Sequence, residues 1–298
     1  MSSVKNTVKD STGKNKVEKN TLYLVAVPIG NLSDFSERAL KVLSEVDFIA
    51  AEDTRNTGLL LARFGIKKPL VSYFEHNKRQ RGEEIVARIE NGESCALVTD
   101  AGMPAISDPG EDLVALCAER GVIVTCVPGC CAVVTALALS GLATGRFAFE
   151  GFLSTSKGER AKRLSEIKNE KRTLIFYEAP HKLRTTLDDL FEVFGDRRIS
   201  LCRELTKLNE EIIRTTLSGA IELYREKSPR GEYVLVMEGE SKDVGSATNE
   251  EENSLLSLSI QEHVSHYEEE GLARMDAIKR AAKDRGMTKS ELYKLLNS

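Results

Sequence analysis

Short runs of β-branched and other apolar residues alternate with helical patterns over the first half of the chain. Between the first two runs, for example, Phe35, Ala39 and Val42 recur at the spacing of one helix face. Strands that alternate with helices favour a mostly parallel sheet covered by helices. The strands are predicted at Leu22–Val27, Val46–Ala51, Pro69–Tyr73, Cys95–Thr99 and Val122–Val127.

The second half of the α/β pattern has more strands per residue than the first. Helical patterns lie between these strands at 157–169 and 181–194. This density predicts a second α/β domain with a mixed sheet. Its strands are predicted at Phe147–Phe152, Thr173–Tyr177, Arg198–Arg203, Ile212–Thr216 and Tyr233–Glu238.

Only helical patterns follow a segment rich in Ser, Glu, Gly and Asn. The last two helices, about 274–285 and 289–297, flank Gly286-Met287-Thr288. Thr288 and Glu291 have the spacing of a capping box at the start of the second helix. These features predict a helix-turn-helix-like extension.

Two earlier helix starts carry similar signals. Asp34 with Glu37 three residues later predicts a capping box at the first helix. Asp108 is a second predicted N-cap, with Pro109 at the first helical position and Gly121 at the helix end.

These patterns divide the chain into five parts. We expect order to begin at Thr21, because the preceding segment has five Lys, two acidic residues and no apolar stretch of a signal peptide. The predicted parts are a disordered tail (1–20), an N-terminal α/β domain (21–145), a C-terminal α/β domain (146–239), a linker (240–256) and the helical extension (257–298).

The composition limits the class of protein. The 298 residues, 41% of them apolar, suffice for two domains with ordinary cores. No stretch approaches the roughly 18 consecutive apolar residues of a membrane span. The six Cys form no CxxC pair and have no zinc-ligand spacing with His, so we expect reduced thiols in a cytoplasmic protein and no metal site. His263 and His266 lie three apart on one helix, but no third ligand accompanies them.

The net charge of −4 by itself argues against a general nucleic-acid binder, but basic residues are clustered. Residues 157–172 carry seven basic and three acidic side chains, and 76–81 and 274–289 are also basic. Acidic segments such as Glu250-Glu251-Glu252 offset the positive charge of these clusters in the net charge of the chain. Each cluster is either a nucleic-acid surface or a solvated helix face.

Three loops rich in Gly and Pro follow strands of the first domain. They are Pro28-Ile29-Gly30-Asn31, 100–110 and Val127-Pro128-Gly129-Cys130-Cys131. In an open α/β sheet, ligands bind beyond the carboxyl ends of the strands, where Gly allows close approach to the backbone. A single such loop is explained as well by a turn that needs a positive φ. The chain has neither GxGxxG after its first strand nor a P-loop, which disfavours dinucleotide oxidoreductases, P-loop NTPases and common Rossmann methyltransferases.

The order of motifs resembles the tetrapyrrole-methylase superfamily. The segments on which this resemblance rests are LYLVAVPIGNLSDFSERAL, AAEDTRNT, LVTDAGMPAISDPG and VPGCCAVVTALALSG, followed by FYEAPH, ELTK and RGEYV. The resemblance runs from about Leu22 to the C-terminus except for the linker, and it is greatest to members that methylate ribosomal RNA.

This resemblance implies a homodimer that binds S-adenosylmethionine between two α/β domains, largely through backbone groups. Tyr177 and Glu178 match the segment that closes over the adenosyl group. Tetrapyrrole-specific members carry a GDP-type turn where this chain has Ala101-Gly102-Met103, so the implied acceptor differs. It is the 2′-oxygen of a cytidine in the decoding region of 16S rRNA. The implied cofactor contacts are Pro28, Ile29, Gly30, Gly102, Met103, Ala105, Cys131, Ala132 and Tyr177.

Methyl transfer to a ribose hydroxyl needs in-line geometry and either a proton acceptor or a cation at the forming alkoxide. Glu178 is the favoured catalytic residue, because it lies between an aromatic strand end and a Pro-started helix. Asp53 or the next residue is equally explained as a helix cap. The other candidates are Glu52, Asp53, Asp100 and Glu204 as carboxylates, and Lys207, Arg55 and His181 as cations.

Two further functions remain open. One is methylation of a tetrapyrrole intermediate, and the other is a non-catalytic RNA-binding factor of ribosome assembly. The basic 157–172 segment and the C-terminal helices favour 16S rRNA or the small subunit as the partner over a tetrapyrrole. The three Gly/Pro loops favour an enzyme over a binding factor.

Overall fold

The computed structural model describes residues 16–240, 258–269 and 271–296. The chain divides into two compact units, Met1–Glu240 and Ser241–Ser298. Most of the predicted tail and of the predicted linker lie outside the described residues.

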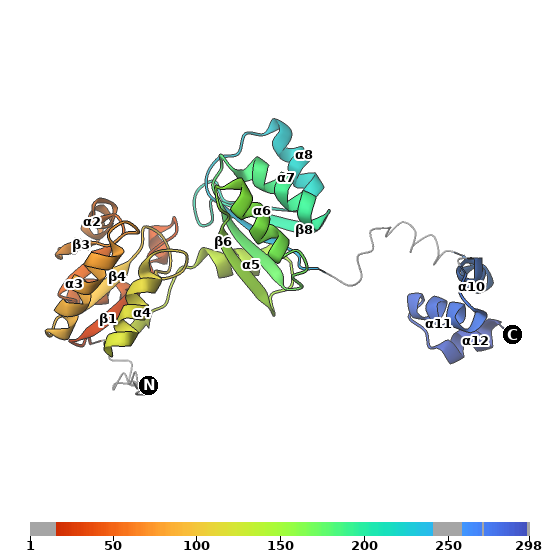
Figure 1. Ribbon diagram of the computed structural model, residues 1–298, viewed down its shortest axis with the longest axis horizontal. Coiled ribbons are helices and arrows are strands. Elements are labelled where there is room, and N and C mark those ends of the chain that lie inside the picture. The colour runs from red at the N-terminus through yellow and green to blue at the C-terminus, as the bar shows by residue number, and fades with distance from the viewer. Residues whose placement is uncertain (1–15, 241–257, 270, 297–298) are drawn as a thin grey trace. The chain divides into compact units, whose positions relative to one another are not determined.

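The first sheet of the larger unit is wholly parallel, and every strand predicted for it is present. Observed and predicted ends differ by at most two residues. Its strands are β1 (Thr21–Val25), β2 (Phe48–Ala51), β3 (Leu70–Ser72), β4 (Cys95–Val98) and β5 (Ile123–Val127). They lie in the order β3-β2-β4-β1-β5, and β2 and β4 are buried throughout, as a sheet covered on both faces requires. Figure 1 shows β1, β3 and β4 with the helices around them.

Helices cover both faces of this sheet. Helices α1 (Glu37–Glu45) and α2 (Thr54–Arg63) pack in one apolar cluster with inward side chains of β1, β2 and β4. Helices α3 (Lys78–Glu90) and α4 (Gly110–Arg120) pack in a second cluster on the opposite face. The three-layer arrangement leaves the carboxyl ends of the strands at one edge, where the Gly/Pro loops lie.

The start of α1 differs from its prediction. Asp34 belongs to a short 3-10 turn, η1 (Leu32–Asp34), and the Ser36 hydroxyl caps α1 by accepting the Ala39 N–H at 3.1 Å. Asp34 as the N-cap is therefore wrong, because the chain makes this extra turn before the helix begins. The cap at Gly121 is confirmed, since this residue ends α4 at a φ of +73°.

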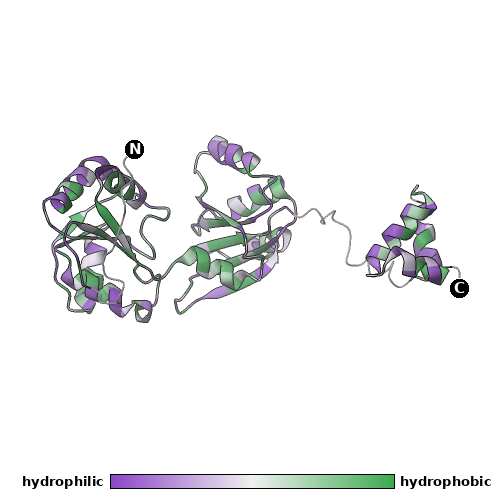
Figure 2. Cartoon of the chain, turned by 90° about the horizontal axis from the view of Figure 1, so that it is seen from below, coloured by the Kyte–Doolittle hydropathy of each residue, from purple (hydrophilic) through white to green (hydrophobic). Residues whose placement is uncertain are grey.

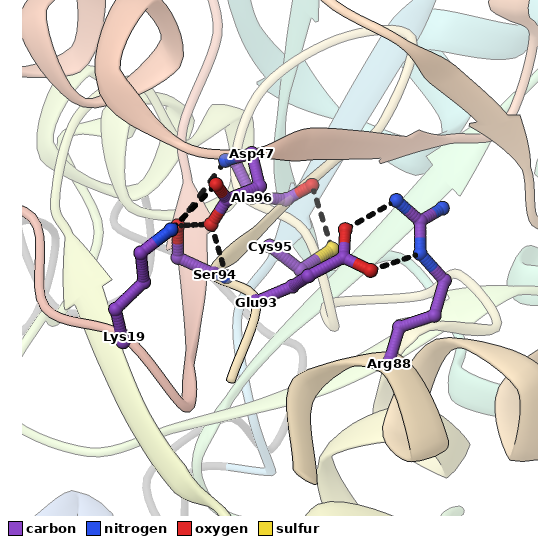
Figure 3. A network of polar contacts seen from close by, with 7 residues as sticks. All are labelled: Lys19, Asp47, Arg88, Glu93, Ser94, Cys95 and Ala96. Atoms are coloured by element: carbon purple, nitrogen blue, oxygen red, sulfur yellow. Dashed lines mark hydrogen bonds and ion pairs between the residues drawn. The ribbon is translucent and has the colours of Figure 1, made fainter. Parts of the chain in front are cut away.

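Order begins before Thr21. Asn20 donates its side-chain amide to the carbonyl of Ile89 at 2.8 Å, and Lys19 forms an ion pair with Asp47 at 2.6 Å. Figure 3 shows Lys19 and Ser94 around the Asp47 carboxylate. Partial burial opposes ionisation of this carboxylate, but the hydrogen bonds from these two residues outweigh it and lower the pKa of Asp47 to about 2.

A second ion pair in Figure 3 closes the same end of the sheet. The Arg88 guanidinium binds the Glu93 carboxylate through both of its oxygens, and the same guanidinium lies 3.5 Å from the centroid of the Phe48 ring. The amino ends of β2 and β4 are thus fixed by charged contacts.

The second sheet is mixed, as predicted. Only β6 and β7 pair in parallel, and the remaining pairs are antiparallel. The order is β6-β7-β10-β8-β9. Its strands are β6 (Phe147–Phe152), β7 (Thr173–Glu178), β8 (Arg198–Arg203), β9 (Glu211–Thr216) and β10 (Tyr233–Met237).

Three helices cover one face of the second sheet and one helix covers the other. On the first face, α6 (Lys157–Glu166), α7 (Leu183–Phe194) and α8 (Leu217–Glu226) pack in a single apolar cluster. On the other face, α5 (Ala132–Ser140) packs against β8 and β10 through Val133 and its neighbours.

The position of α5 corrects the predicted domain boundary at 145/146. This helix precedes the boundary in sequence but packs on the second sheet. The chain therefore passes from the first core to the second in the loop before Ala132. The Val127–Cys131 loop contacts both domains as a result.

The smaller unit contains three helices in its described residues, α10 (Ile260–Glu269), α11 (Arg274–Asp284) and α12 (Lys289–Leu296). Thr288 and Glu291 form the predicted capping box, with N–H to side-chain oxygen distances of 2.8 and 3.3 Å. Figure 2 shows apolar residues along the strands of both sheets and polar residues along one side of many helices. No helix among the described residues is both long and apolar enough to cross a bilayer.

Candidate functional site

A cavity of about 540 Å³ lies in the larger unit where loops from both sheets meet. This volume lies within the range of small-molecule and cofactor sites. The first domain contributes the segments that follow β1, β2 and β4, and the second contributes the start of α5, the end of β7 and the segments around 204 and 232.

The predicted cofactor contacts divide into two groups. Six of the nine line the cavity, namely Ile29, Gly102, Met103, Cys131, Ala132 and Tyr177. Pro28, Gly30 and Ala105 are not among the lining residues.

Gly30 is a point of contact between the two domains. A Cβ atom built on Gly30 would lie 2.4 Å from Cγ of Lys207 and 3.2 Å from the Leu205 carbonyl. The next residue, Asn31, donates its N–H to Oγ1 of Thr206 at 3.1 Å. Gly30 therefore allows the loop after β1 to pack on the loop after β8.

The loop after β4 is held in an unusual backbone conformation. Gly102 has a φ of +81° and pairs with Val27 through two backbone hydrogen bonds of 2.9 and 3.1 Å. Ala105 and Ser107 also have positive φ, at +66° and +68°. The Asp108 carboxylate stabilises this shape by accepting the N–H groups of Ala105 and Gly110. Such backbone strain is concentrated at functional sites in proteins.

Tyr177 supplies an aromatic wall to the cavity. Its ring lies 5.0 Å from the ring of Phe149 and 5.3 Å from the ring of Phe152. Burial raises the pKa of the Tyr177 hydroxyl to about 12, although the Val133 backbone N–H opposes this shift. The hydroxyl therefore stays neutral at physiological pH beside the N-terminus of α5.

Lys207 is the cation of the cavity, and two carboxylates hold it. Its Nζ donates to Oε1 of Glu204 at 2.9 Å and to Oε2 of Glu232 at 2.8 Å. Burial alone would lower the pKa of Lys207, but the two carboxylates raise it above its usual value. Glu204 has a φ of +52°, and its side chain packs directly against Gly231. Lys207 is thus a fixed ammonium and not a proton acceptor.

The carboxylate of Glu178 is engaged on the opposite face of β7 from Tyr177. Glu178 is only 3% exposed. Its Oε1 accepts the Ala179 N–H at 2.8 Å, and its Oε2 accepts the Thr186 hydroxyl at 2.5 Å. Oε2 therefore joins the end of β7 to α7, while Oε1 binds the backbone directly after β7. Although Glu178 lines the cavity, these contacts favour a structural role for its carboxylate over the catalytic role predicted from sequence.

We expect Glu178→Gln to lower the free energy of unfolding by about 1–3 kcal/mol, because the amide nitrogen cannot accept the Thr186 hydroxyl. Turnover should stay within a few-fold of the wild-type value. Thermal unfolding and initial rates measured on one preparation test this expectation. An unchanged melting temperature with a 100-fold slower reaction would restore Glu178 as the catalytic group.

Glu52 and Asp53 are adjacent in sequence but differ in role. Glu52 lines the cavity, and its Oε2 accepts the Thr99 hydroxyl at 2.9 Å. Asp53 caps α2 by accepting the N–H groups of Arg55 and Asn56, so the capping alternative is confirmed. The Arg55 side chain also binds Asp53, and these contacts lower the pKa of Asp53 to about 2. Asp53 and Arg55 are not lining residues.

Glu232 and Phe152 line the cavity but are absent from the residues predicted by sequence. The glycine at position 231, in the turn before β10, is the sequence feature that could have indicated a functional turn next to Glu232. Phe152 gave no signal beyond its place at a strand end. Asp100 and Glu204, both considered from sequence, do line the cavity, whereas His181 does not.

Metal binding has no support in the described residues, where no three His, Cys, Asp or Glu side chains gather closely enough to hold an ion. All six Cys are free thiols.

Solved structures with this fold include several methyl-transferring enzymes. The chain is similar to a uroporphyrin-III-C-methyltransferase from Thermus thermophilus, with a TM-score of 0.54 and 19% identity over 73% of this chain and 94% of that one. It is also similar to a diphthine synthase, with a TM-score of 0.57 and 14% identity over 74% and 90% of the two chains. At this identity the likeness concerns the fold.

Sequence relatives are much more similar. The ribosomal RNA small subunit methyltransferase I of Halalkalibacterium halodurans is 49% identical over 93% of this chain and 95% of its own. The protein of the same name from Bacillus subtilis is 46% identical over 93% and 94% of the two chains. Residues 21–221 match the model of the family described as tetrapyrrole (corrin/porphyrin) methylases.

The match covers the first sheet, the second sheet except β10, and every segment that lines the cavity up to Lys207, and so the chain belongs to the tetrapyrrole (corrin/porphyrin) methylase family.

Proposed function

We propose that the protein transfers a methyl group from S-adenosylmethionine to the 2′-oxygen of a cytidine ribose in 16S rRNA. The observation that carries this proposal is the 49% identity, over 93% of the chain, to a protein named for the methylation of small-subunit ribosomal RNA. A tetrapyrrole acceptor is the alternative that the family name alone would allow.

The cavity suits the methyl donor of this family, S-adenosylmethionine. Its volume matches a ligand of that size, and the Tyr177 ring offers an apolar face for an aromatic base. Cys131 precedes α5 without a capping side chain, so N–H groups at the start of α5 are available to a carboxylate. Ile29, Gly102, Met103 and Ala132 would complete the pocket. The bound cofactor supplies an electrophilic methyl group.

Lys207 and Glu52 are the residues that we assign to the reaction at the acceptor oxygen. Two of the three Lys207 N–H groups bind the Glu204 and Glu232 carboxylates, so the third can stabilise negative charge on the ribose oxygen. The Glu52 carboxylate, at the cavity, accepts the hydroxyl proton as the new oxygen–carbon bond forms. The carbon–sulfur bond breaks in the same displacement.

The exposed lysines of the 157–172 segment form one surface suited to RNA. Its three arginines are committed to carboxylates, as the Arg160–Asp189 and Arg163–Glu150 ion pairs show. Across residues 16–240 no carboxylate partner is found for the four exposed lysines, which can therefore bind phosphates. These lysines are Lys157, Lys162, Lys168 and Lys171.

The helical extension offers a second basic surface. Ala277, Ile278 and Ala281 are buried in its core, whereas Lys279 and Lys283 are exposed. Arg285, a basic residue of the 274–289 segment, donates to Nδ1 of the buried His263 at 3.0 Å. Arg285 thus stabilises the bundle.

The outer face of α5 supports a homodimer. The helix is apolar on nearly every side, yet Val134 is 50% exposed and Leu139 is 36% exposed. An all-apolar helix is normally buried, so this face fits contact with a second copy. Because the proposed substrate is ribosomal, we place the protein in the cytoplasm.

The decisive experiment follows transfer of a labelled methyl group to unmethylated small ribosomal subunits, 16S rRNA or a tetrapyrrole. We expect label in the ribose of one cytidine. Label in the tetrapyrrole alone would replace the proposed acceptor. Binding of RNA with no transfer to any acceptor would favour an assembly factor.

Truncation after Glu240 tests the RNA contribution of the helical extension. We expect cofactor affinity and dimerisation to be retained, while affinity for the small subunit falls and its salt dependence flattens. Each lost phosphate contact should reduce the slope of log affinity against log salt by about one. Lys279→Gln with Lys283→Gln in the full chain is the matched variant. Equal affinities and slopes for all three proteins would exclude the extension from RNA binding.

A further inference from the structure

An exposed aromatic pair follows β3 beside the cavity, outside the pocket itself. The Phe74 side chain is 37% exposed, and its ring centroid lies 6.3 Å from that of the exposed His76 at an angle of 81°. A large exposed aromatic residue on a polar loop is a feature of interaction surfaces.

The position of this pair relative to the cavity follows from the strand register. Ala51 of β2 pairs with Ser72 of β3, and the Tyr73 N–H donates to the Ala51 carbonyl at 2.8 Å. Glu52, the next residue of β2, lines the cavity, so Phe74 emerges at the same sheet edge on the neighbouring strand. The strands of a sheet are only about 4.8 Å apart.

A second contact ties the same segment to the loop after β4. The Tyr73 hydroxyl donates to the Pro109 carbonyl at 3.0 Å, directly after Asp108, which lines the cavity. In the same loop Ile106 also lines the cavity and is 43% exposed. Phe74 and Ile106 are therefore exposed apolar side chains on two connected segments at the cavity edge.

The loop that carries the aromatic pair is preorganised. Asn77 Oδ1 accepts the Phe74 N–H at 2.8 Å, and Asn77 Nδ2 donates to the Ser72 carbonyl at 3.2 Å. Lys78 then joins α3 to α4 through Asp112 at 2.6 Å. A rigid platform loses little conformational entropy when it binds a flexible ligand.

Charge beside the platform favours an anionic ligand. Arg79 is exposed, and no ion pair to it is found in the part of the chain that the structure describes. Lys78 and Arg81 are already paired with carboxylates, so Arg79 is the cation of this segment most available to a phosphate. Aromatic faces next to a cation are how proteins bind unpaired nucleotides.

We propose that Phe74 and His76 stack on a base of the RNA that flanks the target cytidine, while Arg79 binds the adjoining phosphate. This inference rests on the proposed function and adds to it a subsite for a neighbouring nucleotide. The subsite holds the RNA strand at the cavity mouth and so presents one ribose to Lys207 and Glu52.

The test compares Phe74→Ala with Phe191→Ala, which removes a Phe of similar exposure (40%) from α7, away from the cavity. Both are measured for affinity to a single-stranded RNA of the decoding region, KM for small subunits and affinity for S-adenosylmethionine. We expect Phe74→Ala to weaken RNA binding and raise the subunit KM on the order of 10-fold or more. Cofactor affinity should not change, and Phe74→Tyr should be close to wild type.

Abasic RNA locates the stacked base. With that base removed, wild type and Phe74→Ala should bind equally well, as a double-mutant cycle requires for two groups in contact. Equal behaviour of Phe74→Ala and Phe191→Ala would overturn the proposal. An effect on whole subunits without an effect on RNA would also overturn it and indicate a ribosomal protein. If wild-type protein methylates no RNA, the proposed function fails before the variants are compared.

Discussion

Replacing Lys207 by Met is expected to slow methyl transfer on the order of 100- to 1000-fold with little change in the affinity for S-adenosylmethionine. The ammonium of Lys207 is the fixed positive charge that Glu204 and Glu232 hold at the cavity. Removal of one preorganised group that stabilises an oxyanion costs on the order of 100- to 1000-fold in kcat in other enzymes. The measurement is single-turnover transfer to saturating small subunits, with cofactor affinity determined by calorimetry.

Lys227→Met is the matched control for this substitution. Lys227 is also held by a carboxylate, with Nζ 3.0 Å from each oxygen of Glu211, but it does not line the cavity. Lys227→Met removes an ion pair with one carboxylate and Lys207→Met removes ion pairs with two, so a rate loss confined to folded Lys207→Met reports on the position of Lys207 at the cavity. If both lose activity equally, Lys207 stabilises the fold and has no special role at the acceptor.

The strands were predictable from sequence because the pattern of apolar side chains that indicates a strand lies within the strand itself. Leu22–Val27 and Thr173–Tyr177 are short apolar runs bounded by polar turn residues, and each is a buried strand in the structure. The same holds for the capping box of Thr288 and Glu291, whose partners are three residues apart.

The placement of α5 was not predictable in this way. An amphipathic helix indicates by its apolar stripe which core it covers, but α5 is apolar almost all round and has no such stripe. Its sequence neighbours belong to the first sheet, whereas Val133 packs on the second. The boundary between the domains is therefore a tertiary property.

The candidate site shows the same limit of prediction from sequence. Glu178 and Lys207 were both candidates because of their sequence neighbours, but their partners decide what each can do. Thr186, on the following helix, binds the Glu178 carboxylate, and Glu232, 25 residues after Lys207, binds the ammonium. Sequence gives the residue types near a site, whereas the structure gives the partners.

Replacing Gly102 is expected to reduce cofactor binding more than any other change in the loop after β4. A Cβ atom on Gly102 would lie 3.1 Å from Cγ2 of Ile29 and 3.5 Å from the Cys130 carbonyl, which places it among all three Gly/Pro loops. The positive φ of +81° adds backbone strain for any other residue. We expect Gly102→Ala to weaken S-adenosylmethionine binding about 10-fold and the bulkier, β-branched Gly102→Val on the order of 100-fold.

Gly121→Ala separates the two causes of this effect. Gly121 has a similar φ of +73° but ends α4 with no atom within 4 Å of its built Cβ. Both alanine variants should lose about 1–2 kcal/mol of stability from the left-handed backbone, because that cost depends on φ alone. Only Gly102→Ala should lose cofactor affinity, since only its Cβ displaces Ile29 at the cavity wall. Calorimetric titration of the folded variants decides the matter. Wild-type affinity in Gly102→Ala would mean that the loop after β4 lies outside the cofactor pocket, and the methyl donor would then have to bind nearer to Tyr177 and α5.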